Sequence, residues 1–183
     1  MPSYQDEAEL VARAKQFDRT AIAELYRRYV QRIYRYVYYW VGDEPTAEDL
    51  TAEVFLRALE SLTTYSYRGV PFVAWLYRIA QARVADHHRR RARRGEKLPL
   101  DEGLISTEEN LAALAERRET YKDLYAALQR LTAEQRQVIV LKFVAGLKNE
   151  EIAYVLDKSE GAIKALQHRA LASLQRILGE DDE

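Results

Sequence analysis

The chain has 183 residues, of which 48% are apolar and 31% are charged, and its formal net charge is −1. This composition excludes a disordered chain and allows one medium-sized domain or two small ones. The absence of cysteine excludes disulfide bonds and thiolate metal sites, and it indicates a reducing compartment. There is no secretory signal and no apolar run near the roughly 20 residues of a membrane span, so we expect a cytoplasmic protein with no membrane insertion of its own.

The first half of the chain has the periodicity of helices. Residues 6–16 and 19–41 are predicted helices, and the GDEP sequence at 42–45 ends the second. An amphipathic helix follows over 46–62, with Thr46 as its N-cap. Its polar stripe is either a solvated surface or a docking face for a basic partner. The stripe consists of Asp49, Glu53, Arg57 and Glu60, and the apolar face carries Leu50, Val54, Leu59 and Leu62.

The next predicted helix has Pro71 in its first turn and runs to about Arg94. It begins with apolar residues and ends in the arginine run 89–94. Aromatic rings that stack on bases, followed by cations that contact phosphates, are typical of a surface for unpaired DNA. Two alternatives remain, namely solvated charge at a helix C-terminus for the arginines and core packing for Phe72 and Trp75. The aromatic cluster consists of Tyr65, Tyr67, Phe72, Trp75 and Tyr77.

Residues 95–115 change in composition and are predicted to form a flexible linker, because they contain Gly, Pro and acidic residues without a sustained period. A second helical unit follows. Thr132 and Gln135 form a capping box, and Gly146 ends the helix that this box begins. The predicted helices of this unit cover 121–131, 132–146, 149–156 and about 160–178.

The last two predicted helices are joined by a tight turn. Asn149 caps the first of them, Asp157 adopts the left-handed conformation, and Ser159 caps the second. This spacing indicates a helix-turn-helix, whose second helix places its N-terminal residues in the DNA major groove. An ordinary helical hairpin with a solvated polar face is the alternative. The polar face carries Glu160, Lys164, Gln167 and His168.

The sequence does not indicate catalysis. It contains only three histidines, and the adjacent His87 and His88 point in different directions on a helix. It has no HExxH motif, no phosphate-binding loop and no nucleophile constellation. We therefore expect no enzymatic activity, no cofactor and no metal.

Three stretches together resemble one protein family. AEDLTAEVFLRAL at 47–59, YRGVPFVAWLYRIAQARVADHHRRRARR at 67–94 and LTAEQRQVIVLKFVAGLKNEEIAYVLDKSEGAIKALQHRALASL at 131–174 resemble the extracytoplasmic-function (ECF, group 4) class of bacterial sigma-70 factors. This class has only regions 2 and 4. The resemblance implies an all-α protein of two small helical domains, with region 2 at 5–94, a linker at 95–115 and region 4 at 116–178.

The resemblance also implies roles for single residues. The core-polymerase contacts, made by the helix 46–62 on the β′ coiled coil, are Asp49, Glu53, Phe55 and Arg57. The contacts to the −10 promoter element are Tyr67, Arg68, Trp75, Arg83, Arg89, Arg90 and Arg91. The contacts to the −35 element are Lys164, Gln167, His168 and Arg169.

At several positions the chain departs from the family pattern. Ala52 stands where Gln is usual, which removes one expected polymerase contact, and Ala82 stands where Asn is frequent beside a flipped base. Ala165 and Leu166 replace a Ser and an Arg that often contact bases, and Leu171 replaces a frequent Arg. We therefore expect a −35 preference unlike that of the commoner relatives.

The function implied is that of an RNA polymerase sigma factor, which binds core polymerase at the β′ coiled coil and the β flap, recognises the −10 and −35 elements and helps to melt the DNA. An anti-sigma factor is an expected partner. A self-contained helix-turn-helix repressor is the first alternative, and it requires a dimer face and a palindromic site. A helical adaptor without a DNA role is the second.

Overall fold

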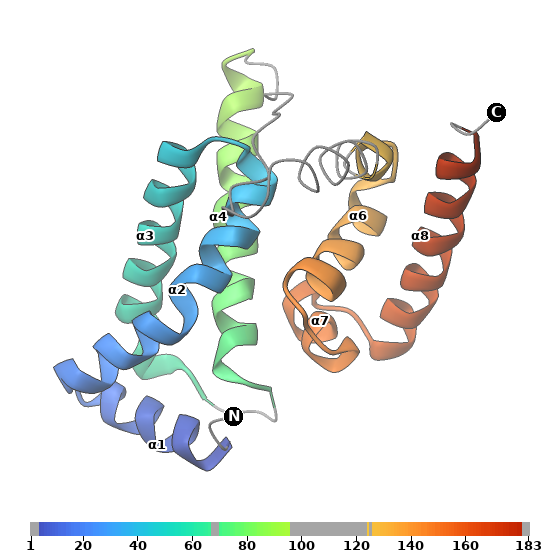
Figure 1. Ribbon diagram of the computed structural model, residues 1–183. Helices are drawn as coiled ribbons and strands as arrows, with labels where there is room; N and C mark the ends of the chain where they lie inside the picture. The colour runs from blue at the N-terminus through green and yellow to red at the C-terminus, as the bar shows by residue number, and fades with distance from the viewer. Residues whose placement is uncertain (1–3, 67–69, 96–123, 125, 181–183) are drawn as a thin grey trace, which may run out of the picture. The chain divides into compact units, whose positions relative to one another are not determined.

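The computed structural model describes residues 4–66, 70–95, 124 and 126–180. Within these ranges the regular structure is helical throughout, and the chain divides into two compact units (Figure 1). One unit is built on the helices before residue 95 and the other on those after residue 126. The predicted all-α fold of two small domains is confirmed. The predicted linker, apart from Gly95, lies outside the described residues.

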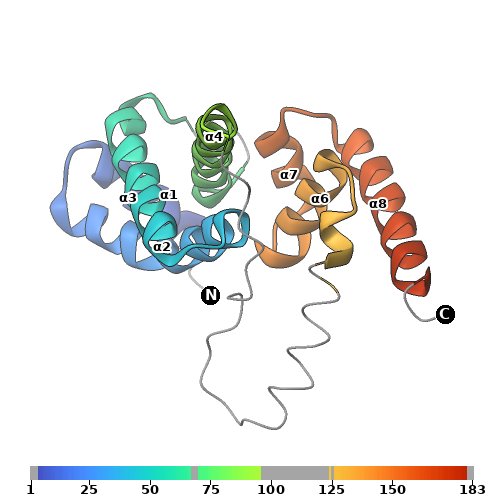
Figure 2. The same cartoon turned by 90° about the horizontal axis from the view of Figure 1, so that it is seen from above.

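The N-terminal unit is a bundle of three long helices with a fourth across one end (Figures 1 and 2). The three long helices pack against one another, and the first helix packs on the second. Large side chains that are almost fully buried form the core, among them Ile33, Tyr36, Val54, Leu76 and Tyr77. The elements are α1 (Tyr4–Lys15), α2 (Arg19–Val41), α3 (Glu44–Ser61), the 3-10 helix η1 (Leu62–Thr64) and α4 (Phe72–Arg93).

The boundary between α2 and α3 corrects one predicted cap. α2 begins and ends as predicted, and Gly42 follows it in the left-handed conformation with φ 66°. The cap of α3 is Asp43, whose carboxylate accepts from the backbone N–H of Thr46 at 2.9 Å. Thr46 therefore lies inside the helix. Pro45 fits the first turn because the N–H groups there have no partner in the helix.

The start of α4 differs slightly from the prediction. Pro71 is extended, with ψ 154°, and precedes the helix rather than lying in its first turn. Its side chain makes no capping hydrogen bond. The backbone N–H of Phe72, the first helical residue, instead donates to the carboxylate of Glu7 on α1 at 2.9 Å.

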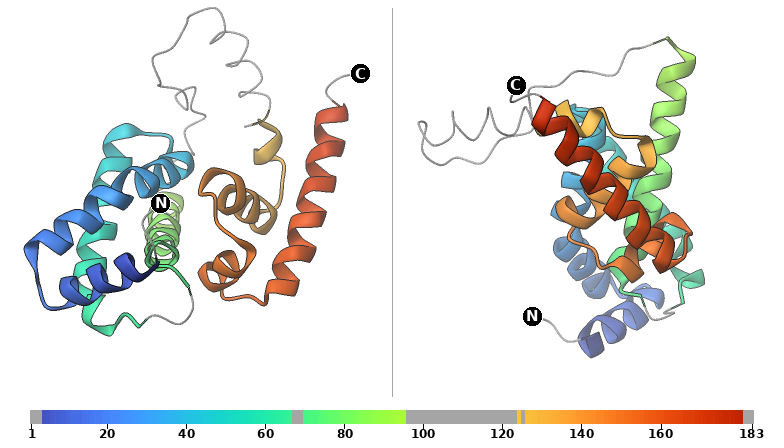
Figure 3. Two further views of the ribbon diagram at one scale, coloured as in Figure 1. Left: turned by 60° about the horizontal axis from the view of Figure 1, so that its bottom comes forward. Right: turned by 90° about the vertical axis from the view of Figure 1, so that its right-hand side faces the viewer.

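The C-terminal unit packs its last helix along α6 (Figure 3). The predicted capping box of Thr132 and Gln135 is confirmed. In addition, the chain widens into one π-helical turn, in which the Ala145 N–H donates to the Val140 carbonyl at 3.0 Å. Gly146 then ends the segment with φ 72°. The elements are α6 (Ala133–Ile139), η2 (Val140–Val144), α7 (Asn149–Leu156) and α8 (Glu160–Glu180). Of the predicted helix 121–131, residues 124 and 126–129 are helical.

The turn between α7 and α8 follows the sequence prediction closely. Asp157 has φ 54°, and the Ser159 hydroxyl accepts from the backbone N–H of Ala162 at 3.2 Å. The predicted cap at Asn149 is wrong, because that residue is the first of α7. The Glu151 carboxylate accepts from the backbone N–H of Lys148 at 2.6 Å and holds this helix start.

Candidate nucleic-acid and protein interfaces

The polar stripe of α3 is exposed as predicted. Asp49, Glu53 and Arg57 lie four residues apart and share one solvent-facing side of the helix. The opposite side is buried against the bundle and carries Ala47, Leu50, Val54 and Ala58. The stripe therefore presents the carboxylates of Asp49 and Glu53 to solvent about one turn apart. Arg57 adds a cation at the far end, where it pairs with Glu60 at 3.1 Å.

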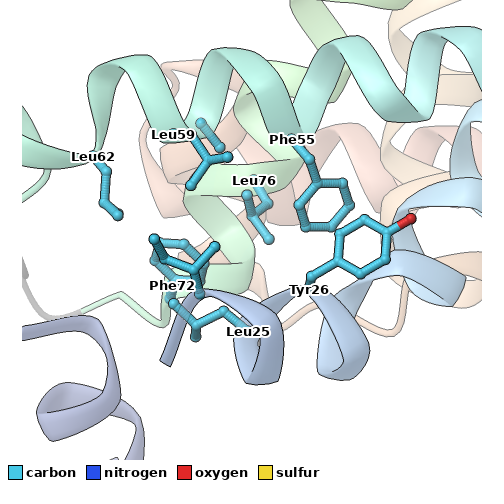
Figure 4. A pocket seen from close by; sticks show the side chains of 9 residues that line it. Leu25, Tyr26, Phe55, Leu59, Leu62, Phe72 and Leu76 are labelled. Carbon is cyan, nitrogen blue, oxygen red and sulfur yellow. The ribbon is translucent and has the colours of Figure 1, made fainter. Parts of the chain in front are cut away.

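Phe55 is the one predicted docking residue outside this stripe. It is half-buried, and its ring meets that of Tyr26 edge-on with 4.9 Å between centroids. Both rings border an apolar hollow between α2, α3 and α4 (Figure 4). Leu59, expected on the buried face, is 38% exposed, and Tyr26 is 47% exposed. The hollow is lined by Ile22, Leu25, Tyr26, Phe55, Ala58, Leu59, Leu62, Phe72 and Leu76.

This hollow was missed by the sequence prediction. The sequence feature that could have predicted the hollow is the width of the apolar stripe on α3. Phe55, Leu56 and Leu59 extend this stripe beyond the face that α2 and α4 cover. Leu56 is 59% exposed. A stripe wider than its packing partners leaves apolar surface in contact with water.

Trp75 lies in a compact aromatic cluster at the start of α4. Its ring centroid is 4.9 Å from that of Tyr65 and 5.3 Å from that of Phe72. Tyr65 and Phe72 are buried, so the core-packing alternative is correct for Phe72, whereas Trp75 is half-buried. Two other predicted −10 residues, Tyr67 and Arg68, lie outside the described residues.

The predicted DNA-binding arginines of α4 differ in their ion-pair partners and in their exposure. The carboxylate of Asp86 pairs with Arg83 at 2.8 Å and also with Arg89. The hydrogen bond from Arg89, assisted by nearby arginine charges, lowers the pKa of Asp86 below its ordinary value. Arg90 is exposed on the same helix. The sequence could have indicated this pairing, because Asp86 lies three positions after Arg83 and three positions before Arg89. Side chains three residues apart are neighbours on a helix.

Arg91 is half-buried and faces a different neighbour. Its positive charge contributes to the lowered pKa of Asp43, whose main cause is the hydrogen bond from Thr46. Arg91 therefore lies within electrostatic reach of the turn between α2 and α3.

On α8 the structure brings together some of the predicted −35 residues. Lys164 pairs with Glu160 at 2.8 Å, and His168 lies one turn further on, with both Lys164 and His168 exposed. Gln167 is half-buried. The buried face of this helix consists of Ile163, Leu166, Ala170 and Ile177.

Arg169 is exposed. Its charge contributes to the lowered pKa of Glu134, for which the main cause is the hydrogen bond from Lys158. Leu166, which the resemblance places where a base-contacting Arg is expected, is 6% exposed and belongs to the core. Ala165 is exposed and adds no hydrogen-bonding group to the surface.

Neither a membrane-spanning helix nor a metal-binding cluster occurs in the described ranges. There, no helix is both long enough and apolar enough to cross a membrane. In the same ranges no group of three or more His, Cys, Asp or Glu side chains is placed to hold a metal ion.

The two units match the two parts of a known class of transcription proteins. Residues 25–94 match Sigma-70 region 2, and residues 121–174 match Sigma-70 region 4. The chain is also 33% identical to the ECF RNA polymerase sigma factor SigX of Bacillus subtilis, over 83% of this chain and 80% of SigX. The chain therefore belongs to the family of ECF RNA polymerase sigma factors, which confirms the resemblance seen in the sequence.

A further relative and two solved structures are similar to the chain. The ECF sigma factor BldN of Streptomyces coelicolor is 42% identical over 94% of this chain, which spans 66% of BldN. The structure of CnrH in complex with the cytosolic domain of CnrY has a TM-score of 0.73 at 23% identity, over 96% of this chain and 98% of that one. The sigma factor RpoE of Bartonella quintana, in complex with the anti-sigma factor NepR, has a TM-score of 0.66 at 22% identity, over 86% and 96% of the two chains. At these identities the two structures show the fold.

Proposed function

We propose that this chain binds core RNA polymerase, directs it to promoters with −10 and −35 elements and helps to melt the DNA. The observation that carries the proposal is the match of one chain to Sigma-70 regions 2 and 4 in that order. Region 2 is assigned to residues 5–94 and region 4 to 116–178, with a linker over 95–115. The chain performs no chemistry in this role and takes no cofactor.

The proposed polymerase-docking face is the stripe on α3. Asp49 and Glu53 are exposed carboxylates on one side of a helix, which suits a basic partner surface such as the β′ coiled coil. Phe55, at the rim of the apolar hollow, adds an apolar contact beside them. Region 4 is assigned to the β flap. Exposed apolar side chains after α6, Phe143 at 61% and Val144 at 48%, support a protein contact there.

Apart from Tyr67 and Arg68, the proposed DNA contacts lie on α4 and α8. Trp75, Arg83, Arg89, Arg90 and Arg91, with Tyr67 and Arg68, are assigned to the −10 element, where rings stack on unpaired bases and cations contact phosphates. On α8, Lys164 and His168 are the exposed pair best placed for a groove, followed by Gln167 and Arg169.

The charge balance of the chain agrees with this role. A chain with a net charge of −1 is not expected to bind duplex DNA tightly by itself. Once polymerase holds both units, binding of one unit to DNA raises the effective concentration of the other unit at its own DNA element. Two weak contacts then combine into tighter binding. A repressor, by contrast, needs tight binding without polymerase.

An anti-sigma factor is the proposed regulatory partner. The RpoE structure is described as a complex with such a factor, and that chain has the same fold as this one. A partner of this kind acts by covering surfaces that polymerase also needs. Purification of the native protein tests this partner, because the chain is expected to be recovered with a second protein that inhibits transcription when added back.

Run-off transcription tests the proposed function. Core polymerase is mixed with fragmented genomic DNA, with or without the protein, and new transcripts are sequenced. Specific transcripts that depend on the protein are expected, and their start sites give the promoter sequence. Tight DNA binding by the protein alone, without new transcripts, would favour the repressor.

A further inference from the structure

Two polar side chains of α1 hold the backbone on either side of the connection between η1 and α4. The Lys15 ammonium donates to the carbonyl oxygen of Tyr65 at 2.8 Å. The Glu7 carboxylate accepts from the backbone N–H of Phe72 at 2.9 Å. These contacts join residues 50 and 65 positions apart in the chain, so they are tertiary contacts rather than local turns.

Glu7 takes the place of a local helix cap. The first N–H groups of a helix have no partner within it, and a side chain just before the helix usually accepts from one of them. Pro71 occupies that position and makes no such bond. The carboxylate of Glu7 supplies the acceptor, and its negative charge suits the positive end of the helix dipole.

The two side chains that hold the backbone, Glu7 and Lys15, are called the anchors and lie on one face of α1. Glu7 and Lys15 are eight residues apart, about two helical turns, with the buried Val11 between them. Small side chains at Ala8 and Ala12 leave a hollow beside this face, which Tyr65 and Ser66 border from the other side. Glu7 and Lys15 both line this hollow, so the two polar contacts stand where apolar side chains do not fill the space between α1 and Tyr65.

The carboxylate of Glu7 is itself held in place. One of its oxygens accepts from the hydroxyl of Tyr29 on α2, which is a buried side chain. Burial, with a smaller contribution from this hydrogen bond, raises the pKa of Tyr29, so the hydroxyl remains a proton donor. Glu7 thus connects α1, α2 and the start of α4.

Among the described residues, both anchored residues are ring partners of Trp75. Tyr65 and Phe72 contact each other at 5.4 Å between centroids, and both contact the Trp75 ring at closer or similar distances. A shift of either backbone segment therefore moves the surface on which Trp75 rests.

We propose that Glu7 and Lys15 are positioning residues that orient Trp75 for capture of unpaired −10 bases. The inference rests on the proposed function. Glu7 and Lys15 act through Tyr65 and Phe72 and do not themselves contact the DNA. A purely stabilising role for α1 is the competing explanation, and it predicts that any equal loss of stability has the same effect.

Two readouts separate these explanations. Trp75 becomes the only tryptophan in a Trp40→Phe background, since the chain has two, and its fluorescence then reports its orientation in the free protein. The second readout is the affinity of the holoenzyme for a single-stranded oligonucleotide carrying the −10 sequence mapped by run-off transcription. The variants are Glu7→Ala, Glu7→Gln and Lys15→Met, and the control is Leu10→Ala, a buried α1 residue outside the anchors.

For Glu7→Ala and Lys15→Met, we expect changed Trp75 emission and strand binding weaker by on the order of tenfold, with unchanged affinity for core polymerase. Glu7→Gln keeps an acceptor oxygen and should restore most of both signals. Leu10→Ala should keep both signals at temperatures where it is folded. Equal losses in Leu10→Ala at matched stability, or no change in the anchor variants, would overturn the inference. Failure of the proposed function would look different, because the wild-type holoenzyme itself would not bind the strand.

Discussion

The carboxylate of Asp86 lies 2.8 Å from the guanidinium of Arg83, one turn earlier on α4, and it also pairs with Arg89 one turn later. Both arginines are assigned to DNA phosphates in the proposed function. A carboxylate that already holds them competes with phosphate for the same hydrogen-bond donors. Part of the basic end of α4 is therefore already neutralised in the free protein.

Replacing Asp86 with Asn should strengthen promoter binding by the holoenzyme. The substitution removes the competing charge, so Arg83 and Arg89 become available to phosphates. The slope of log affinity against log salt should steepen by about 0.7 to 0.9 for each additional phosphate that the arginines neutralise. Affinity measured across a salt series checks this.

Glu24→Gln is the matched control for that experiment, since Glu24 pairs with Arg27 and Arg28 on α2 in the same way. It should leave the slope unchanged. Weaker DNA binding by Asp86→Asn, or equal strengthening by Glu24→Gln, would contradict the competition.

The ion pair between Glu134 and Lys158 should make unfolding of the C-terminal unit depend on pH. The hydrogen bond from Lys158 lowers the pKa of Glu134 from its ordinary value of 4.5. Because the pKa is lower in the folded state, the unfolded state binds more protons as the pH falls below that value. The contribution of Glu134 is therefore present above pH 4.5 and is lost at lower pH.

The difference in Tm between wild type and Glu134→Gln should accordingly be largest near neutral pH and shrink in acid. Thermal unfolding followed by circular dichroism from pH 3 to 7 measures it. Lys158→Ala should produce the same pH profile. A difference that grows in acid would refute the assignment.

Lys164→Ala and His168→Ala should weaken recognition of the −35 element. Both side chains are exposed on the N-terminal half of α8. Loss of a base contact is expected to cost about 1–3 kcal/mol and to relax specificity at one base pair, whereas loss of a phosphate contact weakens all sequences equally. Binding of the holoenzyme to promoters with single −35 substitutions distinguishes the two. Arg176→Ala, exposed twelve residues beyond Lys164, should leave the −35 preference unaltered.

Leu166→Arg, which introduces the residue expected from the family resemblance, should destabilise this chain. Leu166 is buried in the core between α8 and the rest of its unit. The substitution removes apolar packing, for a loss of about 2–5 kcal/mol, and places a charge where water is excluded. Chemical denaturation measures the loss, and the exposed Ala165→Ser should be near neutral. A fully stable Leu166→Arg would show that the side chain has an open path to solvent.

Much of the fold could be predicted from local sequence, because helix periodicity and caps act within a few residues. The bounds of α2 and α7, the capping box at Thr132 and the left-handed Asp157 all follow from short-range rules. The cap of α3 was misplaced because Asp43 and Thr46 both suit a cap, and only the first-turn preference of Pro45 decides between them.

Features that depend on tertiary contacts could not be predicted in this way. No local pattern pairs Glu7 with Phe72, which lies 65 residues away. The π-helical turn after α6 and the hollow beside Tyr26 depend on how helices fit together rather than on the pattern of one helix. Gln167 is half-buried rather than fully exposed for the same reason, since the packing of α8 sets how far its polar face turns toward solvent.

The most direct test of the account is run-off transcription with charge-reversed α3. Asp49→Arg and Glu53→Arg change the proposed polymerase-docking stripe, and Glu9→Arg makes the same charge change at an exposed position on α1. Specific transcripts are predicted with wild type and Glu9→Arg and should disappear with either α3 variant. Undiminished transcripts with both α3 variants would contradict the docking face. Tight sequence-specific DNA binding by the chain alone, with no polymerase-dependent transcript, would contradict the sigma-factor function itself.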